Sequence, residues 1–308
     1  MIPSYADPSE MLARINQLRR ERDAVILTHN YQLGEVQDIA DFTGDSLELS
    51  IQAAKTKAST IVFCGVKFMA ETASLLSPEK TVLLPVLEAG CPMADMADAA
   101  ELRKLKAEHP DAIVACYVNS TAEVKAECDI CVTSANAEKI VNSLPKDRKV
   151  IFVPDKNLGA YVAQKTGREL ILWPGFCPTH MRITAEAIMR RKQEFPEAKV
   201  IIHPESRLSV IALADEVLST GGMCRYARES NANCFIVATE AGIIYRLQKE
   251  NPGKQFIPVS EQAVCPNMKM TRLEDLLASL ENMQHRISIP EDLRERAKLP
   301  IERMLNSN

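Results

Sequence analysis

The sequence predicts an α/β protein made of three homologous α/β/α domains, with small parallel sheets arranged around a pseudo-threefold axis. Three observations predict this fold. Short β-branched apolar segments alternate with helical patterns along the chain, which is typical of parallel sheets that carry helices on both faces. Cysteine–proline pairs recur at nearly equal intervals. The polar residues that end the first strand of each unit recur at the same interval.

The repeat is visible in several independent sets of residues. Cys91, Cys177 and Cys265 are each followed by proline and are separated by 86 and 88 residues. Separations of 88 and 86 residues relate three further sets, which are His29, Tyr117 and His203; Tyr31, Asn119 and Glu205; and Ser46, Ser134 and Thr220. A period of this length matches a small domain rather than a solenoid unit.

Each unit is predicted to contain strands separated by helices. Strands are expected near 24–28, 60–64 and 81–86 in the first unit, near 112–117, 129–133, 148–153 and 169–173 in the second, and near 199–203, 216–219, 233–238 and 254–257 in the third. The second strand of the first unit is poorly marked. A final helix begins at about residue 271, where Leu273, Leu276, Leu277 and Leu280 share one face.

The predicted domains are residues 1–107, 108–195 and 196–284. Helical segments at 1–23 and 285–308 are expected to cover the outside, and the second of these is assigned to the first domain. A chain of 308 residues, 46% of them hydrophobic and 25% charged, can bury the cores of two or three domains.

Composition also limits the classes of partner. A net charge of −4 without a basic block gives no support for nucleic-acid binding. No apolar stretch approaches the roughly 18 residues of a membrane helix, and the N-terminus lacks the pattern of a signal peptide, so no membrane partner is predicted. Nine cysteines without such a signal indicate a reducing, cytoplasmic location, where thiols bind metal or stay buried.

The ends of the strands are the predicted ligand site, because parallel α/β sheets bind ligands beyond the carboxyl ends of their strands. Each unit's first strand ends in a polar aromatic side chain, and three such ends are expected to face one central cavity; they are His29, Tyr117 and His203. The hydroxyl-bearing segments at Ser46, Ser134 and Thr220 each follow a strand and precede a helix. They fit two roles, capping of a helix or binding of an anion at its N-terminus.

The cysteines that precede proline are the predicted metal ligands. Equivalent positions in three units bring the thiolates of Cys91, Cys177 and Cys265 together, and three thiolates with one open position suit an iron–sulfur cluster or a catalytic zinc. If the metal is zinc, His180 is the best candidate for a fourth ligand. Lys269, close behind Cys265, fits anion attraction and solvent exposure equally well.

The other cysteines are not predicted to have a chemical role. Cys128 and Cys131 form a CxxC pair on a predicted strand, where residues three apart face opposite sides, so a redox or metal site is not expected there. The remaining four are interpreted as small buried hydrophobes, namely Cys64, Cys116, Cys224 and Cys234.

These residues and their neighbours resemble the quinolinate synthase family, which makes the pyridine ring on the bacterial route to NAD. The similarity covers nearly the whole chain and runs in order through THNYQLGEVQDIADFTGDSLELS, GVKFMAET, LEAGCPMA, YVNSTAEVKA, TSANA, PDKNLGAYVAQKTG, CPTHM, HPES, STGGM, ATEAGIIYRL and CPNMK. The resemblance implies three similar α/β domains about a pseudo-threefold axis.

The resemblance also implies a cofactor and a reaction. The cofactor is a 4Fe-4S cluster on Cys91, Cys177 and Cys265, with one iron free for substrate. The reaction joins iminoaspartate with dihydroxyacetone phosphate and releases phosphate and two waters to give quinolinate. The substrate pocket that the family implies comprises His29, Tyr31, Ser46, Tyr117, Val118, Asn119, Ser134, His180, His203, Pro204, Glu205 and Thr220.

Successive dehydration and condensation steps require groups that give and take protons. Four pocket residues are assigned as catalytic, namely Tyr31, His180, His203 and Glu205. Glu205 is hypothesised to be the principal general base, because a carboxylate beside a cation and a histidine stays ionised. Two departures from the family pattern, CPNM in place of a CxxC pair beside Cys265 and Ser206 in place of a cysteine, leave these residues unchanged.

Two other functions are compatible with the residue types. The first is a zinc-dependent lyase or aldolase that acts on a phosphorylated sugar, with the same three cysteines and His180 as ligands. The second is a non-enzymatic iron–sulfur sensor or scaffold, which would not need the inward-facing polar columns. An aspartate oxidase or dehydrogenase that produces iminoaspartate is the partner that the family reading suggests.

Overall fold

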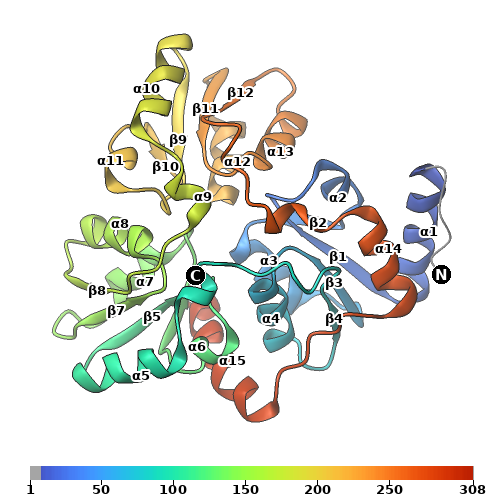
Figure 1. Cartoon of the computed structure of the whole chain (residues 1–308), viewed down its shortest axis with the longest axis horizontal. Coiled ribbons are helices and arrows are strands. Elements are labelled where there is room, and N and C mark those ends of the chain that lie inside the picture. The colour runs from blue at the N-terminus through green and yellow to red at the C-terminus, as the bar shows by residue number, and fades with distance from the viewer. Residues whose placement is uncertain (1–7, 308) are drawn as a thin grey trace.

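The computed structural model describes residues 8–307, and it contains three parallel four-stranded sheets with helices between the strands. The strand orders are β2-β1-β3-β4, β6-β5-β7-β8 and β10-β9-β11-β12, so one topology occurs three times. The three units surround a common centre (Figure 1). The predicted fold class, three α/β/α units with small parallel sheets, is confirmed. Residues 1–7 of the predicted N-terminal helix lie outside the described residues.

The strands lie close to their predicted positions. They are β1 (Ala24–His29), β2 (Phe42–Gly44), β3 (Thr60–Cys64), β4 (Thr81–Leu83), β5 (Ile113–Tyr117), β6 (Ile130–Val132), β7 (Val150–Val153), β8 (Leu170–Leu172), β9 (Lys199–Ile202), β10 (Glu216–Val217), β11 (Cys234–Ala238) and β12 (Gln255–Pro258). The poorly marked strand of the first unit is β2. The strand predicted to reach residue 86 ends at Leu83, because Pro85 has no N–H to donate to a ladder.

The helices fill the connections between the strands. They are α1 (Pro8–Glu21), α2 (Gly34–Ile39), α3 (Ser46–Lys55), α4 (Lys67–Leu76), α5 (Ala99–Glu108), α6 (Ala122–Lys125), α7 (Ala137–Ser143), α8 (Lys156–Thr166), α9 (Pro178–Met181), α10 (Ala185–Glu194), α11 (Leu208–Ile211), α12 (Thr220–Glu229), α13 (Ile243–Glu250), α14 (Leu273–Asn282) and α15 (Glu291–Asn306). Two 3₁₀ turns, η1 (Ala94–Met96) and η2 (Asn267–Lys269), complete the list.

One hydrogen bond recurs in all three units. An aspartate just before or beside the second strand accepts a hydrogen bond from the backbone of the first strand, and the three pairs are Ile26 N to Asp41 Oδ2 (2.9 Å), Val114 N to Asp129 Oδ2 (2.8 Å) and Val200 N to Asp215 Oδ2 (2.8 Å). The repeat seen in the sequence is therefore matched by the same hydrogen bond in each unit. The carboxyl ends of the three first strands accordingly occupy equivalent positions around the centre.

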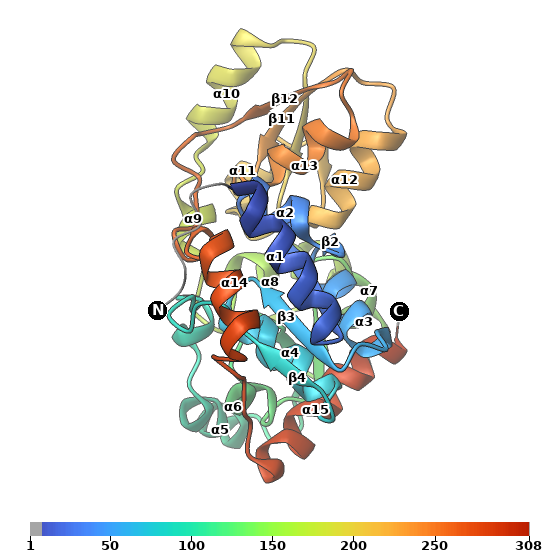
Figure 2. The same cartoon turned by 90° about the vertical axis from the view of Figure 1, so that its right-hand side faces the viewer.

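The helix that follows each cysteine–proline pair packs on the next unit. Thus α5 contacts α6 of the second unit, and α10 contacts β11 of the third. By the same rule α14 packs on α1 and β3 of the first unit (Figure 2). Its residues Leu276, Leu277 and Leu280 join the core there. The sequence assigned α14 to the domain 196–284, whereas its apolar face covers the first sheet. The three units consequently form a closed ring.

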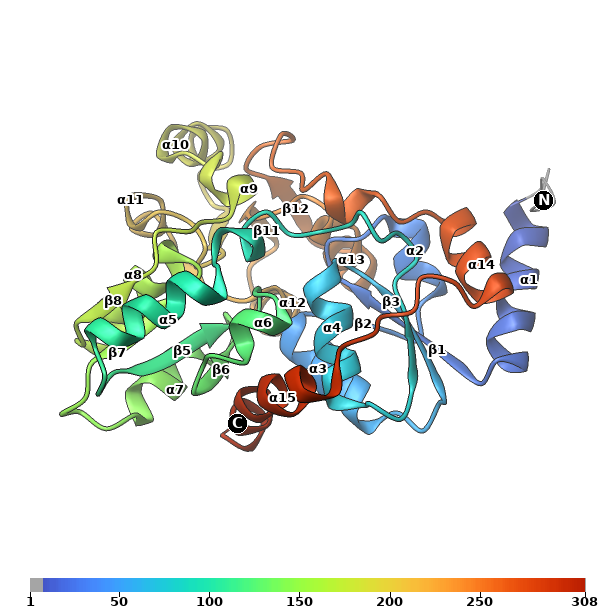
Figure 3. The same ribbon diagram turned by 60° about the horizontal axis from the view of Figure 1, so that its bottom comes forward.

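The C-terminal helix α15 lies between two units. It contacts α4 of the first unit and both α6 and β6 of the second (Figure 3). It buries Ala297, Ile301 and Met304. The tail therefore bridges the first two units in addition to covering the outside. None of the helices in residues 8–307 combines the length and apolar character needed to cross a bilayer.

Two of the predictions about the cysteines are wrong. Cys128 lies in the turn between α6 and β6 rather than on the strand, so strand alternation does not separate it from Cys131. Cys234, expected to be buried, is partly exposed at the start of β11, whereas Cys64, Cys116 and Cys224 are buried as predicted.

Candidate functional site

A single cavity at the centre of the ring is lined by residues from all three units. Thirteen predicted site residues line it. They are the three cysteines Cys91, Cys177 and Cys265, together with His29, Tyr31, Ser46, Tyr117, Asn119, Ser134, His180, His203, Glu205 and Thr220. The cavity also contains apolar side chains such as Val66, Met93 and Met268.

Two predicted substrate residues do not line this cavity. Val118 packs in the hydrophobic core, because it is the residue between Tyr117 and Asn119 and points away from them. Pro204 lines a neighbouring surface pocket instead. The side chains on either side of each do line the cavity, which matches the alternation of extended backbone.

The three cysteines occupy equivalent turns. Each begins a short helical segment, which is η1 after Cys91, α9 after Cys177 and η2 after Cys265. Backbone N–H groups two or three residues further on donate to the sulfurs: Met93 and Ala94 to Cys91, His180 to Cys177, and Asn267 and Met268 to Cys265. Proline, which has no N–H, occupies the position next to each sulfur.

Burial makes these thiols hard to ionise on their own. It raises the pKa of Cys91 to about 12, and it also raises the pKa values of Cys177 and Cys265. The N–H groups directed at each sulfur act in the opposite direction. A cationic group that binds the sulfurs displaces their protons, so the donor set suits a metal group that carries positive charge.

The spacing of possible ligands distinguishes two kinds of metal group. Among residues 8–307, the His, Cys, Asp and Glu ligand atoms that all lie within 4.8 Å of one another belong to Cys177, His180 and Glu205, and this group can hold a metal ion. A single tetrahedral ion with metal–sulfur bonds of about 2.3 Å keeps its sulfurs within about 4 Å of one another. The sulfurs of Cys91, Cys177 and Cys265 are more widely spaced, which fits a polynuclear group.

Glu205 lies at the centre of a hydrogen-bonded group. The residue is 4% exposed; Tyr117 donates its OH to Oε1 at 2.6 Å, and Nδ1 of His180 lies 2.8 Å from Oε2. Burial opposes ionisation, but His180, His203 and these two hydrogen bonds more than offset it and hold the pKa of Glu205 well below its usual range. The carboxylate is therefore ionised, and it lies between the hydroxyl of Tyr117 and the imidazole of His180.

The hydrogen-bonded group continues on the other side of His180. Thr239, directly after β11, lies with Oγ1 2.8 Å from His180 Nε2 and 2.5 Å from the OH of Tyr31. Burial, and next the charge of Glu205, raise the pKa values of both Tyr31 and Tyr117. Both phenols consequently remain protonated, and a continuous series of hydrogen-bonded side chains runs from Tyr31 through Thr239, His180 and Glu205 to Tyr117.

The two histidines at the ends of first strands are neutral. Burial lowers the pKa of His29 to about 3, with a further contribution from His203, and burial likewise lowers the pKa of His203 to about 3. His203 Nε2 lies 3.2 Å from the hydroxyl of Ser134, and the centre of its ring lies 4.8 Å from that of His180, with the two rings tilted by 31°. Neutral imidazoles can donate or accept a hydrogen bond without repelling a metal group.

The hydroxyl segments do not act as helix caps through the residues first suspected. The N-caps of α3, α7 and α12 are Asp45, Asn136 and Ser219, respectively, and Ser46 and Thr220 occupy the following position. The expectation of open backbone cradles is only partly met, because the Asp45 carboxylate accepts from Leu47 N, Glu48 N and Gly221 N. The hydroxyls of Ser46, Ser134 and Thr220 face the cavity instead.

Sequence reasoning missed the residues at the ends of the third strands. Thr239 and Glu240 directly follow β11. Asp155 lies two residues after the end of β7. Glu240 is fully buried, lines the cavity, accepts from Cys265 N at 3.1 Å and pairs with Lys269 at 3.0 Å, so Lys269 is a structural partner. The rule that ligands bind at strand ends, applied to every strand, would have found these residues.

Comparisons with known proteins give one consistent result. A family model described as "Quinolinate synthetase A protein" matches residues 13–306. The chain is 63% identical over 292 residues to a quinolinate synthase of Dehalococcoides mccartyi strain CBDB1, covering 95% of this chain and 96% of that protein. It is 58% identical over 293 residues to a quinolinate synthase of Pelobacter propionicus, with 95% and 96% covered. A protein named quinolinate synthase 1 from Methanosarcina acetivorans is 54% identical over 297 residues, with 96% and 97% covered.

Proposed function

Because this chain belongs to the quinolinate synthetase A family, and is thus an enzyme of NAD biosynthesis, we propose that it condenses iminoaspartate with dihydroxyacetone phosphate. The proposed products are quinolinate, phosphate and two waters. The observation that carries the proposal is the ionised Glu205, buried between the Tyr117 hydroxyl and Nδ1 of His180 in a cavity that also holds three cysteines.

We propose that the cavity binds a 4Fe-4S cluster through Cys91, Cys177 and Cys265. Equivalent turns, N–H groups directed at each sulfur and a spacing wider than a single ion requires all fit this group. When bound, a cluster with three protein ligands supplies an iron that acts as a Lewis acid toward a substrate oxygen. The fixed cation also favours the ionised form of Glu205.

The proton transfers are assigned to side chains of this chain. Glu205 is the general base, since it is the ionised carboxylate of the hydrogen-bonded group. Tyr31 holds a proton on the side of Thr239, Tyr117 holds one on the opposite side, and His180 connects Thr239 to Glu205. His203, which is neutral and contacts Ser134, can accept or donate a hydrogen bond to substrate.

Substrate orientation is assigned to the remaining polar lining. The substrates together carry two carboxylates and a phosphate, and hydroxyl groups at the openings of helices suit such anions. These groups come from Ser46, Ser134 and Thr220, one in each unit. Asn119 adds an acceptor, because its Oδ1 is buried without a protein partner among residues 8–307. His29 lines the cavity beside Tyr31, at a ring distance of 4.7 Å.

One assay tests the proposed reaction. Protein purified and reconstituted with iron and sulfide without air is mixed with dihydroxyacetone phosphate and freshly generated iminoaspartate, and quinolinate is measured by chromatography. The proposal predicts quinolinate and phosphate in equal amounts. The Cys177→Ser variant should lose both the visible absorption of the cluster and the product, whereas Cys224→Ser, which changes a buried cysteine outside the cavity, should keep both. Absence of quinolinate from protein with a full complement of iron contradicts the proposal.

One observation favours a second candidate, the zinc lyase or aldolase. Cys177, His180 and Glu205 lie close enough together to hold a single ion. Zinc is colourless because its d shell is full, whereas an iron–sulfur protein absorbs visible light. Metal analysis of protein purified without air decides between them: about four irons per chain support the cluster, and one zinc with no iron supports the alternative.

The supply of iminoaspartate and the location follow from the same proposal. Iminoaspartate is unstable in water, so an aspartate oxidase or dehydrogenase is the proposed partner that provides it. A cytoplasmic location is proposed because all nine cysteines are free thiols in the structure, as is usual for proteins in a reducing compartment.

A further inference from the structure

One hydroxyl of the cavity is supported from behind by an asparagine of another unit. Asn30 directly follows β1 of the first unit, has no exposed surface and is not among the residues that line the cavity. Its Nδ2 donates to Oγ1 of Thr220 at 2.9 Å, and Thr220 is the first residue of α12 in the third unit. Its Oδ1 accepts from Nη1 of Arg246 on α13 at 2.6 Å. The amide thus connects a guanidinium to a residue that lines the cavity.

The guanidinium sets the orientation of the amide. A guanidinium has only donors, so the atom of Asn30 that faces Arg246 must be the oxygen. The same Nη1 donates to Thr43 O at 2.8 Å, and Nε of Arg246 pairs with Glu250 at 2.6 Å, so the arginine side chain is held by three partners. The NH₂ group of Asn30 is consequently directed at Thr220, whose oxygen accepts from it.

The hydrogen of the Thr220 hydroxyl therefore needs a different acceptor. The carboxylate at this end of α12 belongs to Asp45, and four other groups already donate to it, namely Leu47 N and Glu48 N to Oδ1, and Ser219 Oγ and Gly221 N to Oδ2. Among residues 8–307, the one hydrogen bond of the Thr220 hydroxyl is the bond that it accepts from Asn30. Thr220 is 3% exposed and lines the cavity, so the remaining acceptor is a molecule bound in the cavity.

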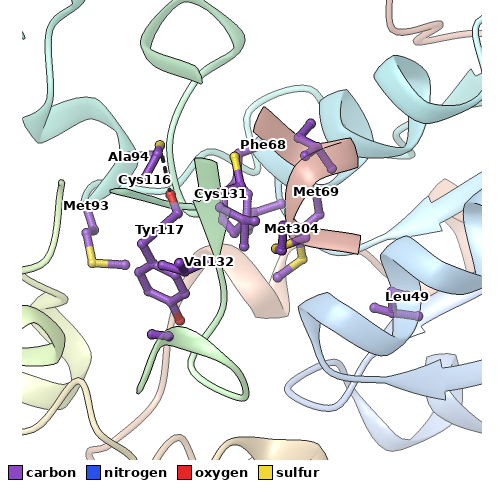
Figure 4. Packing of buried hydrophobic residues seen from close by; sticks show 14 of the residues in the cluster. Leu49, Phe68, Met69, Met93, Ala94, Cys116, Tyr117, Cys131, Val132 and Met304 are labelled. Atoms are coloured by element: carbon purple, nitrogen blue, oxygen red, sulfur yellow. Dashed lines mark hydrogen bonds between the residues drawn. The ribbon is translucent and has the colours of Figure 1, made fainter. Parts of the chain in front are cut away.

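This support is specific to one unit of the repeat. Steps of 88 and 86 residues relate Asn30 to Val118 and Pro204, whose side chains cannot donate a hydrogen bond. Val118 follows Tyr117 and belongs to the hydrophobic cluster that Figure 4 shows in part. The counterparts of Thr220 in the other two units therefore receive no hydrogen bond from an amide at this position.

We propose that Asn30 is a positioning residue, which keeps the Thr220 hydroxyl as a hydrogen-bond donor to an anionic oxygen of a substrate. The inference deepens the proposed binding of substrate anions by Thr220 and rests on it. Ionised carboxylate and phosphate oxygens both accept hydrogen bonds. A hydroxyl that donated backwards instead would present a lone pair to the anion and repel it. The amide thus determines whether this part of the cavity attracts or repels an anion.

Asn30→Asp reverses this hydrogen bond and keeps the shape of the side chain. Both oxygens of a carboxylate accept, so Arg246 keeps its partner while the Thr220 hydroxyl turns to donate to the second oxygen. We expect Kd for a bound anion to rise by about 10- to 150-fold, which corresponds to the loss of one hydrogen bond to a charged group. Thr220→Val, which removes the hydroxyl and keeps the volume, should raise Kd by a similar factor. The matched control is Asn251→Asp, the same change at a buried asparagine after α13 and outside the cavity, which should leave Kd unchanged.

Binding is measured by calorimetry without air, on protein loaded with iron and sulfide. The probes are glycerol 3-phosphate, a stable analogue of the triose phosphate, and succinate, a stable four-carbon dicarboxylate. Weaker binding of the first probe assigns a phosphate to Thr220, weaker binding of the second assigns a carboxylate, and weaker binding of both means that the two anions share the hydroxyl. Quinolinate formation by the same protein tests the proposed reaction separately, because wild-type protein that binds a probe but makes no quinolinate contradicts the reaction and not this inference.

A double-mutant cycle separates the hydroxyl from the added charge. If Asn30 acts through Thr220, Asn30→Asp should change Kd by less than about twofold in the Thr220→Val background. An equal loss of affinity in both backgrounds would mean that the charge acts directly, and it would overturn the proposal. Unchanged probe binding in either single variant, or no binding of either probe by the wild type, would overturn it as well. If Asn30→Asp does not fold, Arg246→Met, which releases the amide, is taken through the same cycle with the same criteria.

Discussion

The charge of Glu205 is the feature of the site whose removal is most informative. Both carboxylate oxygens are engaged, one with Tyr117 at 2.6 Å and the other with His180 at 2.8 Å. Glutamine has the same shape and keeps one acceptor oxygen for the phenol. Its NH₂ group then faces His180 Nδ1, which accepts a hydrogen bond in the tautomer whose hydrogen is on Nε2. Glu205→Gln therefore keeps the packing and removes the base.

The expected loss follows from that single change. A positioned general base contributes about 10²- to 10⁴-fold to a rate, which is about 3 to 5 kcal/mol of transition-state free energy. We expect kcat of Glu205→Gln to fall by a factor in that range, while KM for dihydroxyacetone phosphate stays within about threefold, since the hydroxyls proposed to bind substrate are untouched. The cluster absorption should be unchanged because the three cysteines are intact.

Quinolinate formation measured without air at several substrate concentrations separates kcat from KM. A matched control is Glu71→Gln, which makes the same substitution at another buried carboxyl group, one that lies outside the cavity and accepts from Ala122 N. This control should keep activity within about twofold of the wild type. Full activity of Glu205→Gln would remove Glu205 from its role as base, and an equal loss in both variants would trace the effect to stability.

Three further predictions concern stability. Since the folded-state pKa of both His29 and His203 is about 3 against an ordinary 6.5, unfolding takes up protons between these values. The unfolding free energy of metal-free protein should therefore fall as pH drops below about 6.5, by up to about 2.7 kcal/mol per pH unit, and asparagine at both positions should flatten this slope in urea titrations. Asp215→Ala leaves Val200 N without its acceptor and should cost about 1–3 kcal/mol by the same method; an unchanged urea midpoint would mean that water replaces the carboxylate. Leu277→Ala, at a fully buried position of α14, should cost about 2–5 kcal/mol and shift one cooperative transition; a separate early transition would mean that α14 unfolds independently.

Most of the site could be predicted from the sequence because its residues recur at equivalent positions of the repeat. His29, Tyr117 and His203 occupy one column of the repeat, and the structure brings all three to the cavity. Spacing alone therefore identified strand ends without any knowledge of the sheets. The same reasoning gave the strand positions, because apolar β-branched segments in a doubly covered sheet are continuous in the sequence.

The remaining features depend on contacts between units, which spacing does not encode. Thr239 connects Tyr31 to His180 through three different units, and Asp45 of α3 reaches the opening of α12. The location of α14 on the first sheet was missed for the same reason, since an apolar helical face does not state which sheet it covers. Cys128 was misplaced because it was counted with the strand predicted near 129–133, whereas β6 begins only at Ile130.

The closed ring restricts how the molecule can open. Each cysteine-bearing turn leads into a helix that is anchored on the neighbouring unit, so every seam between units is crossed by one of these turns. Parting any two units must therefore bend a turn that carries Cys91, Cys177 or Cys265. A motion that opened the centre would therefore also shift the three sulfurs and whatever they hold.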